Sequence, residues 1–182
     1  MSLAYRTAAV PVTLLGVALL AGCTDASPTA PSASSAAGSP AMSAVQARPF
    51  GGRCETAITP IAPQPGDPPN AFRLHIEYVC QLAHLGRTTA VAEQIVIATG
   101  PTTQVASNTT VYTAANGDQL FATWSGSSTF DPATFDVVFS GPETYTGGTG
   151  RFAQASGSAF ISGTASLSAN TGEFTSEGTL SY

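Results

Sequence analysis

Apolar residues occupy every second position along residues 72–80, and this period of two is the feature that most limits the fold of the chain. One face carries Phe72, Leu74, Ile76, Tyr78 and Cys80, and the other carries Arg73, His75 and Glu77. Burying three ionisable groups without partners in a narrow interior costs several kcal/mol. We therefore expect a β-strand whose apolar face points into the core.

The same pattern recurs over residues 50–182, which show no helical period of useful length. Gly, Pro, Asn and Asp separate the alternating segments, and Asn116-Gly117 is a strong hairpin signal because a type I′ turn needs two positive φ angles. The expected strands are 54–61, 72–80, 88–98, 105–115, 119–127, 135–146, 154–167 and 174–182. Eight strands joined mostly by tight turns favour an all-β fold, an antiparallel up-and-down eight-stranded barrel.

The N-terminal region has the layout of a signal peptide, expected at residues 1–22, because Arg6 is its only charge and an apolar stretch follows. The stretch ends in Leu20-Ala21-Gly22-Cys23, which resembles the bacterial lipobox, where the cysteine is acylated and the chain is cut just before it. The alternative is an ordinary signal peptide cut elsewhere, with Cys23 an incidental thiol. Residues 23–49 are rich in Ser, Ala and Pro and are expected to form a disordered tether to a single barrel domain at 50–182.

Charge and location limit the partners. Eleven acidic residues, six arginines and no lysine give a net charge of −5, so no basic patch is available for a phosphate backbone and nucleic-acid binding is excluded. The expected partners are a membrane, reached through the N-terminal lipid, and a hydrophobic small molecule. The expected location is the bacterial cell envelope, lipid-anchored and extracytoplasmic. No cofactor and no metal site are expected, and the oligomeric state stays open.

Two cysteines remain once Cys23 is acylated, namely Cys54 and Cys80, which lie 26 residues apart in a chain exported to an oxidising compartment. A disulfide between them leaves no odd thiol. It should contribute about 3 kcal/mol to stability in the chain-entropy model and join the first strand to the second. The alternative is a pair of buried free thiols.

Four segments together carry a resemblance to a known family. They are 83–87 (AHLGR), 113–118 (TAANGD), 146–153 (TGGTGRFA) and 177–182 (EGTLSY). They resemble secreted bacterial β-barrels that are similar to the allene oxide cyclase and dirigent superfamily. The resemblance covers about residues 80–182 and implies a calycin-like barrel of eight antiparallel strands, with Phe152 closing one end. The catalytic residues of either family have no matching positions here, so it implies no activity.

Few residues of the sequence are candidates for metal binding, ligand binding or catalysis. His75 and His84 point to opposite faces, so a shared metal site is not expected, and His84 is expected to hydrogen-bond its turn. Arg151 is expected to pair with a carboxylate at the barrel rim. Glu143 and Glu177 both lie in strands where either could face inward, although the alternation of the last strand leaves Glu177 outside.

The lumen of an eight-stranded barrel is either filled by side chains or holds one small ligand. The candidate pocket-lining residues are Tyr78, Leu120, Trp124 and Phe139. The other large apolar residues that could fill the lumen are Phe121, Phe135, Tyr145, Phe152 and Phe160. Small residues at positions 122, 141, 159, 163 and 165 leave room for a cavity.

These observations lead to three hypotheses about function. The first is a small-ligand-binding or surface-interaction module that is not an enzyme. The second is a cyclase- or isomerase-like enzyme acting on a hydrophobic small molecule in the lumen, and the third is a structural envelope lipoprotein. An apolar cavity with two or more inward polar groups favours the enzyme, an apolar cavity alone favours a carrier, and a filled lumen favours interaction through the outer surface.

The lipobox predicts that the mature chain begins at an acylated Cys23. Mass spectrometry of protein purified from its native membrane should find this modified N-terminus, and an unmodified N-terminus at another residue would contradict it. The substitution Cys23→Ser should release a soluble, folded domain, because the tether separates the anchor from the barrel.

Overall fold

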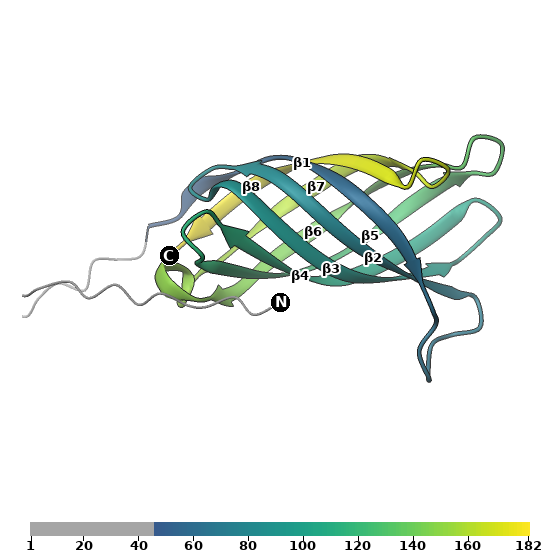
Figure 1. Ribbon diagram of the computed structural model, residues 1–182, viewed down its shortest axis with the longest axis horizontal. Helices are drawn as coiled ribbons and strands as arrows, with labels where there is room; N and C mark the ends of the chain where they lie inside the picture. Colours follow the sequence, from purple (N-terminus) through teal and green to yellow (C-terminus); the bar gives the residue numbers. More distant parts are fainter. Residues whose placement is uncertain (1–45) are drawn as a thin grey trace, which may run out of the picture. The chain divides into compact units, whose positions relative to one another are not determined.

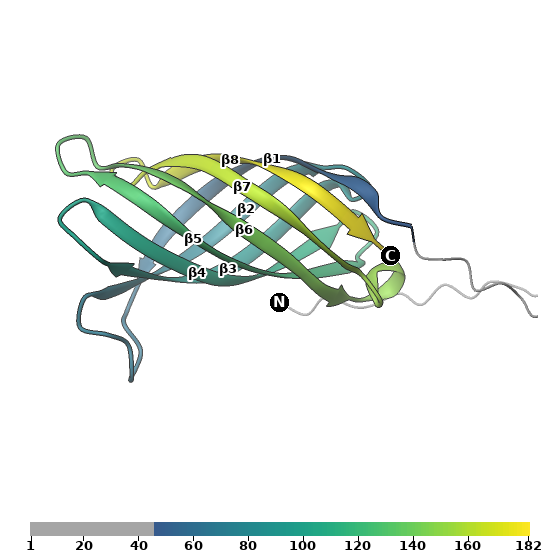
Figure 2. The ribbon, with the colours of Figure 1, turned by 180° about the vertical axis from the view of Figure 1, so that it is seen from behind.

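The computed structural model describes residues 46–182, which form one closed antiparallel barrel (Figures 1 and 2). The expected signal peptide, Cys23 and residues 24–45 of the expected tether lie outside the described residues. Each strand pairs with its neighbours in the chain, and β1 pairs with β8 to close the sheet. The strands are β1 (Arg48–Ile61), β2 (Ala71–Leu82), β3 (Gly86–Ala98), β4 (Thr103–Ala114), β5 (Gln119–Asp131), β6 (Asp136–Gly148), β7 (Ser156–Ser166) and β8 (Thr171–Ser181).

The expected all-β up-and-down barrel is therefore confirmed, and so are the expected inward face of β2 and the outward position of Glu177 in β8. In β2, Leu74, Ile76 and Tyr78 are buried, whereas Glu77 on the opposite face is exposed. Glu177 lies on the outer face of β8. The inward set also includes Leu120, Ala122, Trp124, Phe174 and Leu180. The last strand was expected to include Tyr182, but this residue follows the end of β8 and is half-buried.

Pro142 interrupts the pairing of β6 with one neighbour but does not end the strand, which was expected at 135–146. Residues 136–148 form a single strand through Pro142, whose register with β7 is continuous. Pairing with β5 stops at Trp124–Glu143 and resumes at Ser127–Ser140, since proline has no N–H to donate. In this gap the indole N–H of Trp124 donates a hydrogen bond to the carbonyl oxygen of Gly141 at 3.2 Å.

Three expected lumen phenylalanines lie elsewhere. Phe135 was expected in a strand, but β5 extends to Asp131 and moves the turn, so that Phe135 has a φ of 63° and a side chain 52% exposed. Phe160 points outward because Ala159 and Ile161 take the inward positions of β7. Phe121 is half-buried on the outer face of β5. The alternation along the whole strand determines which residues face the core, so the size of one residue does not decide which face it lies on.

One end of the barrel is sealed by packed side chains, and we call it the sealed end. A short 3-10 helix, η1 (Gly150–Phe152), places Phe152 in the interior, where its side chain is fully buried. Its ring lies 5.0 Å from the ring of Tyr182. Leu120 and Leu180 are also fully buried and close this half of the lumen. The expectation that Phe152 closes an end of the barrel agrees with this burial.

Polar contacts hold the loops of the sealed end together. Arg151 donates a hydrogen bond to the carbonyl oxygen of His84 at 2.7 Å, and its Nε lies 3.7 Å from a carboxylate oxygen of Asp118. The ring Nε2 of His84 lies 3.0 Å from the carbonyl oxygen of Pro49. Arg151 therefore pairs at the rim as expected, and His84 bonds to the backbone of β1 beside its own turn.

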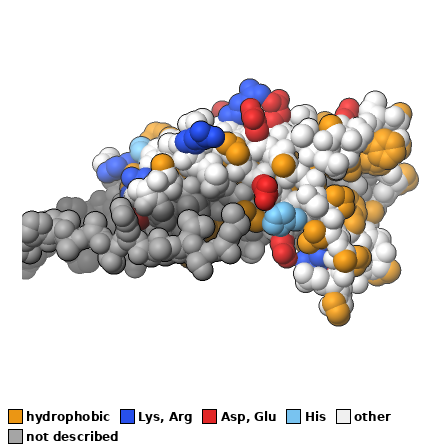
Figure 3. Space-filling view, viewed as in Figure 1, with side chains coloured by type: hydrophobic (Ala, Val, Ile, Leu, Met, Phe, Trp, Pro, Cys, Tyr) orange, Lys and Arg blue, Asp and Glu red, His pale blue; other side chains and the backbone are white. Residues whose placement is uncertain are grey.

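The opposite end carries the loops 62–70, 99–102, 132–135 and 167–170, and we call it the mouth. Apolar side chains gather on the surface around the mouth (Figure 3). Val105, Phe135 and Val138 belong to this group and are 42%, 52% and 59% exposed. No helix in residues 46–182 has the length and apolar character needed to span a membrane.

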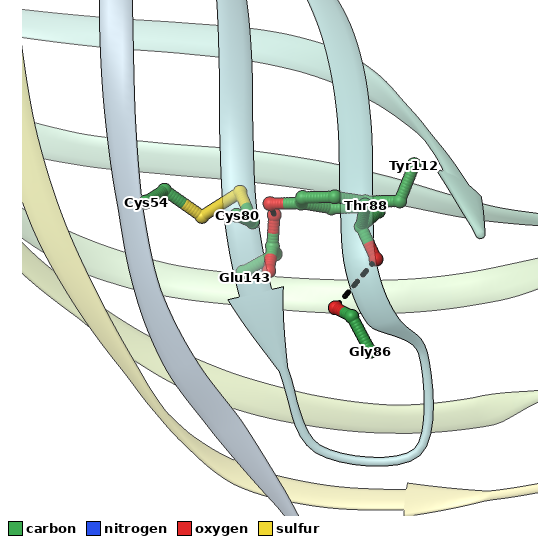
Figure 4. Close-up of a disulfide and its surroundings, with 6 residues drawn as sticks. All are labelled: Cys54, Cys80, Gly86, Thr88, Tyr112 and Glu143. Atoms are coloured by element: carbon green, nitrogen blue, oxygen red, sulfur yellow. Dashed lines mark hydrogen bonds between the residues drawn. A yellow bond between two sulfur atoms is a disulfide. The ribbon is translucent and has the colours of Figure 1, made fainter. Parts of the chain in front are cut away.

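The predicted disulfide between Cys54 and Cys80 is present. The two residues are register partners in β1 and β2, with Cα atoms 4.0 Å apart, and both side chains are buried inside the barrel. The bond therefore joins two neighbouring strands close to the end of β2 (Figure 4).

Removal of this bond should lower the free energy of unfolding by about 3 kcal/mol, because the unfolded chain regains the entropy of a closed loop. The double variant Cys54→Ala/Cys80→Ala should show this loss in urea unfolding relative to the unsubstituted chain. Reduction of the unsubstituted chain should produce a similar loss. A loss under about 1 kcal/mol in both measurements would contradict the stabilising role.

Candidate functional site

A cavity of about 80 Å³ lies in the lumen between the barrel centre and the mouth. That volume exceeds the roughly 10–15 Å³ that one water molecule requires, so it accommodates several waters or one small ligand. Its wall is mainly apolar and includes Ile58, Leu74, Ile76, Val96, Ala106, Trp124, Val137, Phe139, Ile161 and Phe174. Tyr78, Tyr112 and Glu143 line it at the barrel centre, and we call these three residues the floor.

Glycines beside the large rings leave room for them against the barrel wall. A Cβ atom on Gly126 would lie 2.4 Å from the ring of Trp124, and one on Gly163 would lie 2.8 Å from the ring of Phe139. Both rings therefore lie against the barrel wall. Trp124 and Phe139 pack edge to face with their centroids 6.1 Å apart. The large side chains consequently line the space instead of filling it.

Glu143 is the buried acid of the described chain, with a residue exposure of only 1%. It comes from β6, and the hydroxyl of Tyr112 on β4 donates a hydrogen bond to its Oε1 at 2.8 Å. Burial raises the pKa of Glu143 to about 6, although the hydroxyls of Tyr112 and Tyr145 act in the opposite direction. Burial and the nearby carboxylate raise the pKa of Tyr112, so this hydroxyl keeps its proton. Figure 4 shows the two side chains meeting beside the disulfide.

Two more tyrosines surround the same carboxylate. Burial raises the pKa of Tyr78 and of Tyr145, and the negative charge of Glu143 raises both further. The hydroxyls of Tyr145 and Ser176 are buried and have no hydrogen-bond partner within the described residues. One carboxylate is thus surrounded by three neutral tyrosines, with spare hydroxyl groups just beneath the floor.

The predicted pocket residues are only partly brought together. Tyr78, Trp124 and Phe139 line the cavity, whereas Leu120 is fully buried toward the sealed end and does not line it. Leu120 lies near the start of β5, where the strands meet the sealed end, and this position explains the difference.

From the sequence alone the side of the strand that Glu143 faces stays open, and Tyr112 is not among the candidate residues. Glu143 is separated by an even number of residues from Val137, Phe139 and Tyr145, so it lies on the same face of β6 as these apolar and aromatic residues. This spacing was the sequence signal that Glu143 faces inward. Tyr112 shares a face with Ala106 and Ala114, but Val105 and Val111 on the other face weaken the contrast.

Comparison of the chain with protein-family models, curated proteins and solved structures finds no match. The fold and the site therefore define the class of protein by themselves. It is an up-and-down eight-stranded barrel, sealed at one end, with a mainly apolar cavity above a buried acid. Within residues 46–182 no group of three or more His, Cys, Asp or Glu side chains is placed to hold a metal ion.

The raised pKa of Glu143 predicts a specific pH dependence of stability. Folded protein holds this proton at pH values where the unfolded chain, with the ordinary glutamate pKa of 4.5, has released it. Stability should therefore fall by about 2 kcal/mol as the pH rises from 4.5 through about 6, and the contribution of Glu143 should then be constant.

The variant Glu143→Gln tests this dependence, because glutamine keeps an acceptor for Tyr112 and does not titrate. The difference in unfolding free energy between the variant and the unsubstituted chain should shift in favour of the variant by about 2 kcal/mol between pH 4 and pH 7. Urea unfolding at several pH values measures it. A difference that does not change with pH would contradict the assignment.

Proposed function

We propose that this protein is a binding module that holds a small, mainly apolar molecule in the lumen of its barrel. The observation that carries the proposal is the cavity itself, whose apolar wall ends at a polar floor. Small-molecule sites have this composition, in which apolar side chains supply affinity and a few polar groups orient the ligand.

We further propose that the module is attached to the bacterial cell envelope by a lipid on Cys23 and lies on the extracytoplasmic side. The position of β1 is compatible with such an anchor. Arg48 begins β1 at the sealed end, so the chain enters the barrel on the side away from the mouth. An anchor that precedes Arg48 would therefore leave the mouth free for the ligand.

A second candidate function is favoured by Glu143. The cavity has more than two inward polar groups, which is the arrangement expected for a cyclase- or isomerase-like enzyme. A buried carboxylate with a pKa of about 6, bonded to the Tyr112 hydroxyl, can give or take a proton near neutral pH. Binding is common to both candidates, and only the enzyme requires proton transfer at Glu143. A structural lipoprotein with a filled lumen does not use the cavity and is the weakest of the three hypotheses.

Trp124 makes the binding proposal directly testable, because it is the only tryptophan of the chain and it lines the cavity. Titration with 1-octanol should give a saturable change in Trp124 fluorescence. The variant Ala106→Leu should abolish this change, since Ala106 lines the cavity and a larger side chain there occupies it.

The matched control is Ser107→Leu, which adds a leucine at the next position of β4 but on the exposed face. This variant should bind 1-octanol as the unsubstituted chain does. A fluorescence change that does not saturate, or that is equal in Ala106→Leu and Ser107→Leu, would overturn the proposal.

A further inference from the structure

The charge inside the cavity is negative and has no partner. Of the residues that line the cavity within the described chain, Glu143 is the only charged one, and none is Lys, Arg or His. The remaining titratable groups around Glu143 are Tyr78, Tyr112 and Tyr145, whose raised pKa values keep them neutral. The cavity therefore presents a single anionic group to whatever enters it.

Most other polar groups nearer the mouth are already paired with one another. Asn108 donates to Gln94 at 3.1 Å, Thr110 donates to Asn108 at 3.0 Å, and Ser128 donates to Gln104 at 3.2 Å. By contrast, the groups around the Glu143 carboxylate are neutral hydroxyls: Tyr112 donates a hydrogen bond to Oε1, and the Tyr145 hydroxyl also stabilises the charged form. The lining of the cavity within residues 46–182 contains no cation to pair with this carboxylate.

These features select the chemistry of the ligand's inner end. A carboxylate whose neighbours are neutral hydroxyls and no cation is costly to bury, and an ammonium group that binds it offsets this cost with charge-assisted hydrogen bonds. Aromatic faces near the floor also attract a cation, and Tyr78 and Phe174 pack edge to face there at 5.6 Å. A ligand carboxylate in the same place would be repelled by Glu143.

We propose that the molecule bound in this cavity is an amphipathic primary amine, with its ammonium group on Glu143 and its apolar body along the aromatic wall toward the mouth. This inference rests on the proposed function and specifies the chemical class of its ligand.

The dimensions of the lumen limit the apolar body. Six residues of β6 separate Val137, nearer the mouth, from Glu143. At about 3.3 Å per residue and a strand tilt of about 40°, they span about 15 Å along the barrel axis. The small volume of the cavity favours an unbranched chain over a fused ring system.

Three probes with the same eight-carbon chain separate the head groups, namely n-octylamine, 1-octanol and n-octanoate. Trp124 fluorescence at pH 7.5 should show that the full chain binds n-octylamine at least tenfold more tightly than 1-octanol, and n-octanoate most weakly. Glu143→Gln should reduce the affinity for the amine to that for the alcohol. The preference for the amine should also decrease as the pH falls below about 6, where Glu143 becomes protonated.

Two variants separate the charge of Glu143 from a general disturbance of the floor. Tyr112→Phe removes a hydrogen-bond donor but keeps the carboxylate, so it should retain the preference for the amine, and circular dichroism should show both floor variants folded. Ala106→Leu should bind none of the probes, and amine binding that persists in it would place the amine on the acidic outer surface and overturn the inference.

The remaining outcomes separate this inference from the proposed function. Equal affinity for the three probes, or a preference that survives Glu143→Gln, would overturn the amine assignment and leave a lumen-binding module. If none of the three probes changes Trp124 fluorescence saturably, the proposed function is overturned as well.

Discussion

Hydrogen bonding between β1 and β8 closes the eight strands into a barrel, and this closure determines how much space each inward side chain has. A barrel of this size encloses a lumen that is only wide enough for side chains or for one small ligand. A large residue can therefore point inward only where a small one lies beside it. Gly126 beside Trp124 and Gly163 beside Phe139 are examples, because a Cβ atom at either glycine would meet the ring. The cavity exists because large and small residues are matched in this way.

One half of the lumen is filled and the other is partly open, because the inward positions of the strands carry larger side chains in the first half than in the second. Toward the sealed end the inward positions carry Leu120 and Leu180, and η1 adds Phe152, so this half is filled. Toward the mouth, Ala106 and Ala165 line the lumen and leave it partly open. The contacts of Arg151 with Asp118 and His84 hold the loops over the filled half. The barrel is thereby a container with one usable opening.

The floor between these halves holds the most unusual group of the molecule. A buried glutamate without a cation opposes folding near neutral pH, and a packed apolar side chain at Glu143 would avoid this cost. Buried acids with raised pKa values occur most often at functional sites, which is why the proposals place the ligand there. The unpaired hydroxyls of Tyr145 and Ser176 are further buried polar groups with unused hydrogen-bonding capacity in the same region.

The sequence by itself determined the barrel, the sidedness of most strands and the disulfide. Alternation with period two specifies which residues share a face, and the contrast between Leu74 and Glu77 specifies which face is inside. The even number of cysteines left after Cys23 specified the pairing. The predicted position of Phe160 was wrong because the two faces of β7 differ little in hydrophobicity. Phe160 lies on the face opposite to Ala159 and Ile161, which point inward.

Only the tertiary structure decided the site. Tyr112 and Glu143 lie on β4 and β6, which are separated by β5 and share no backbone pairing, so their 2.8 Å contact depends on the curvature of the closed barrel. Whether the lumen is open or filled depends likewise on which inward residues face each other across it. Periodicity describes one strand at a time, and the curvature that brings inward residues of different strands together is not encoded in a single strand.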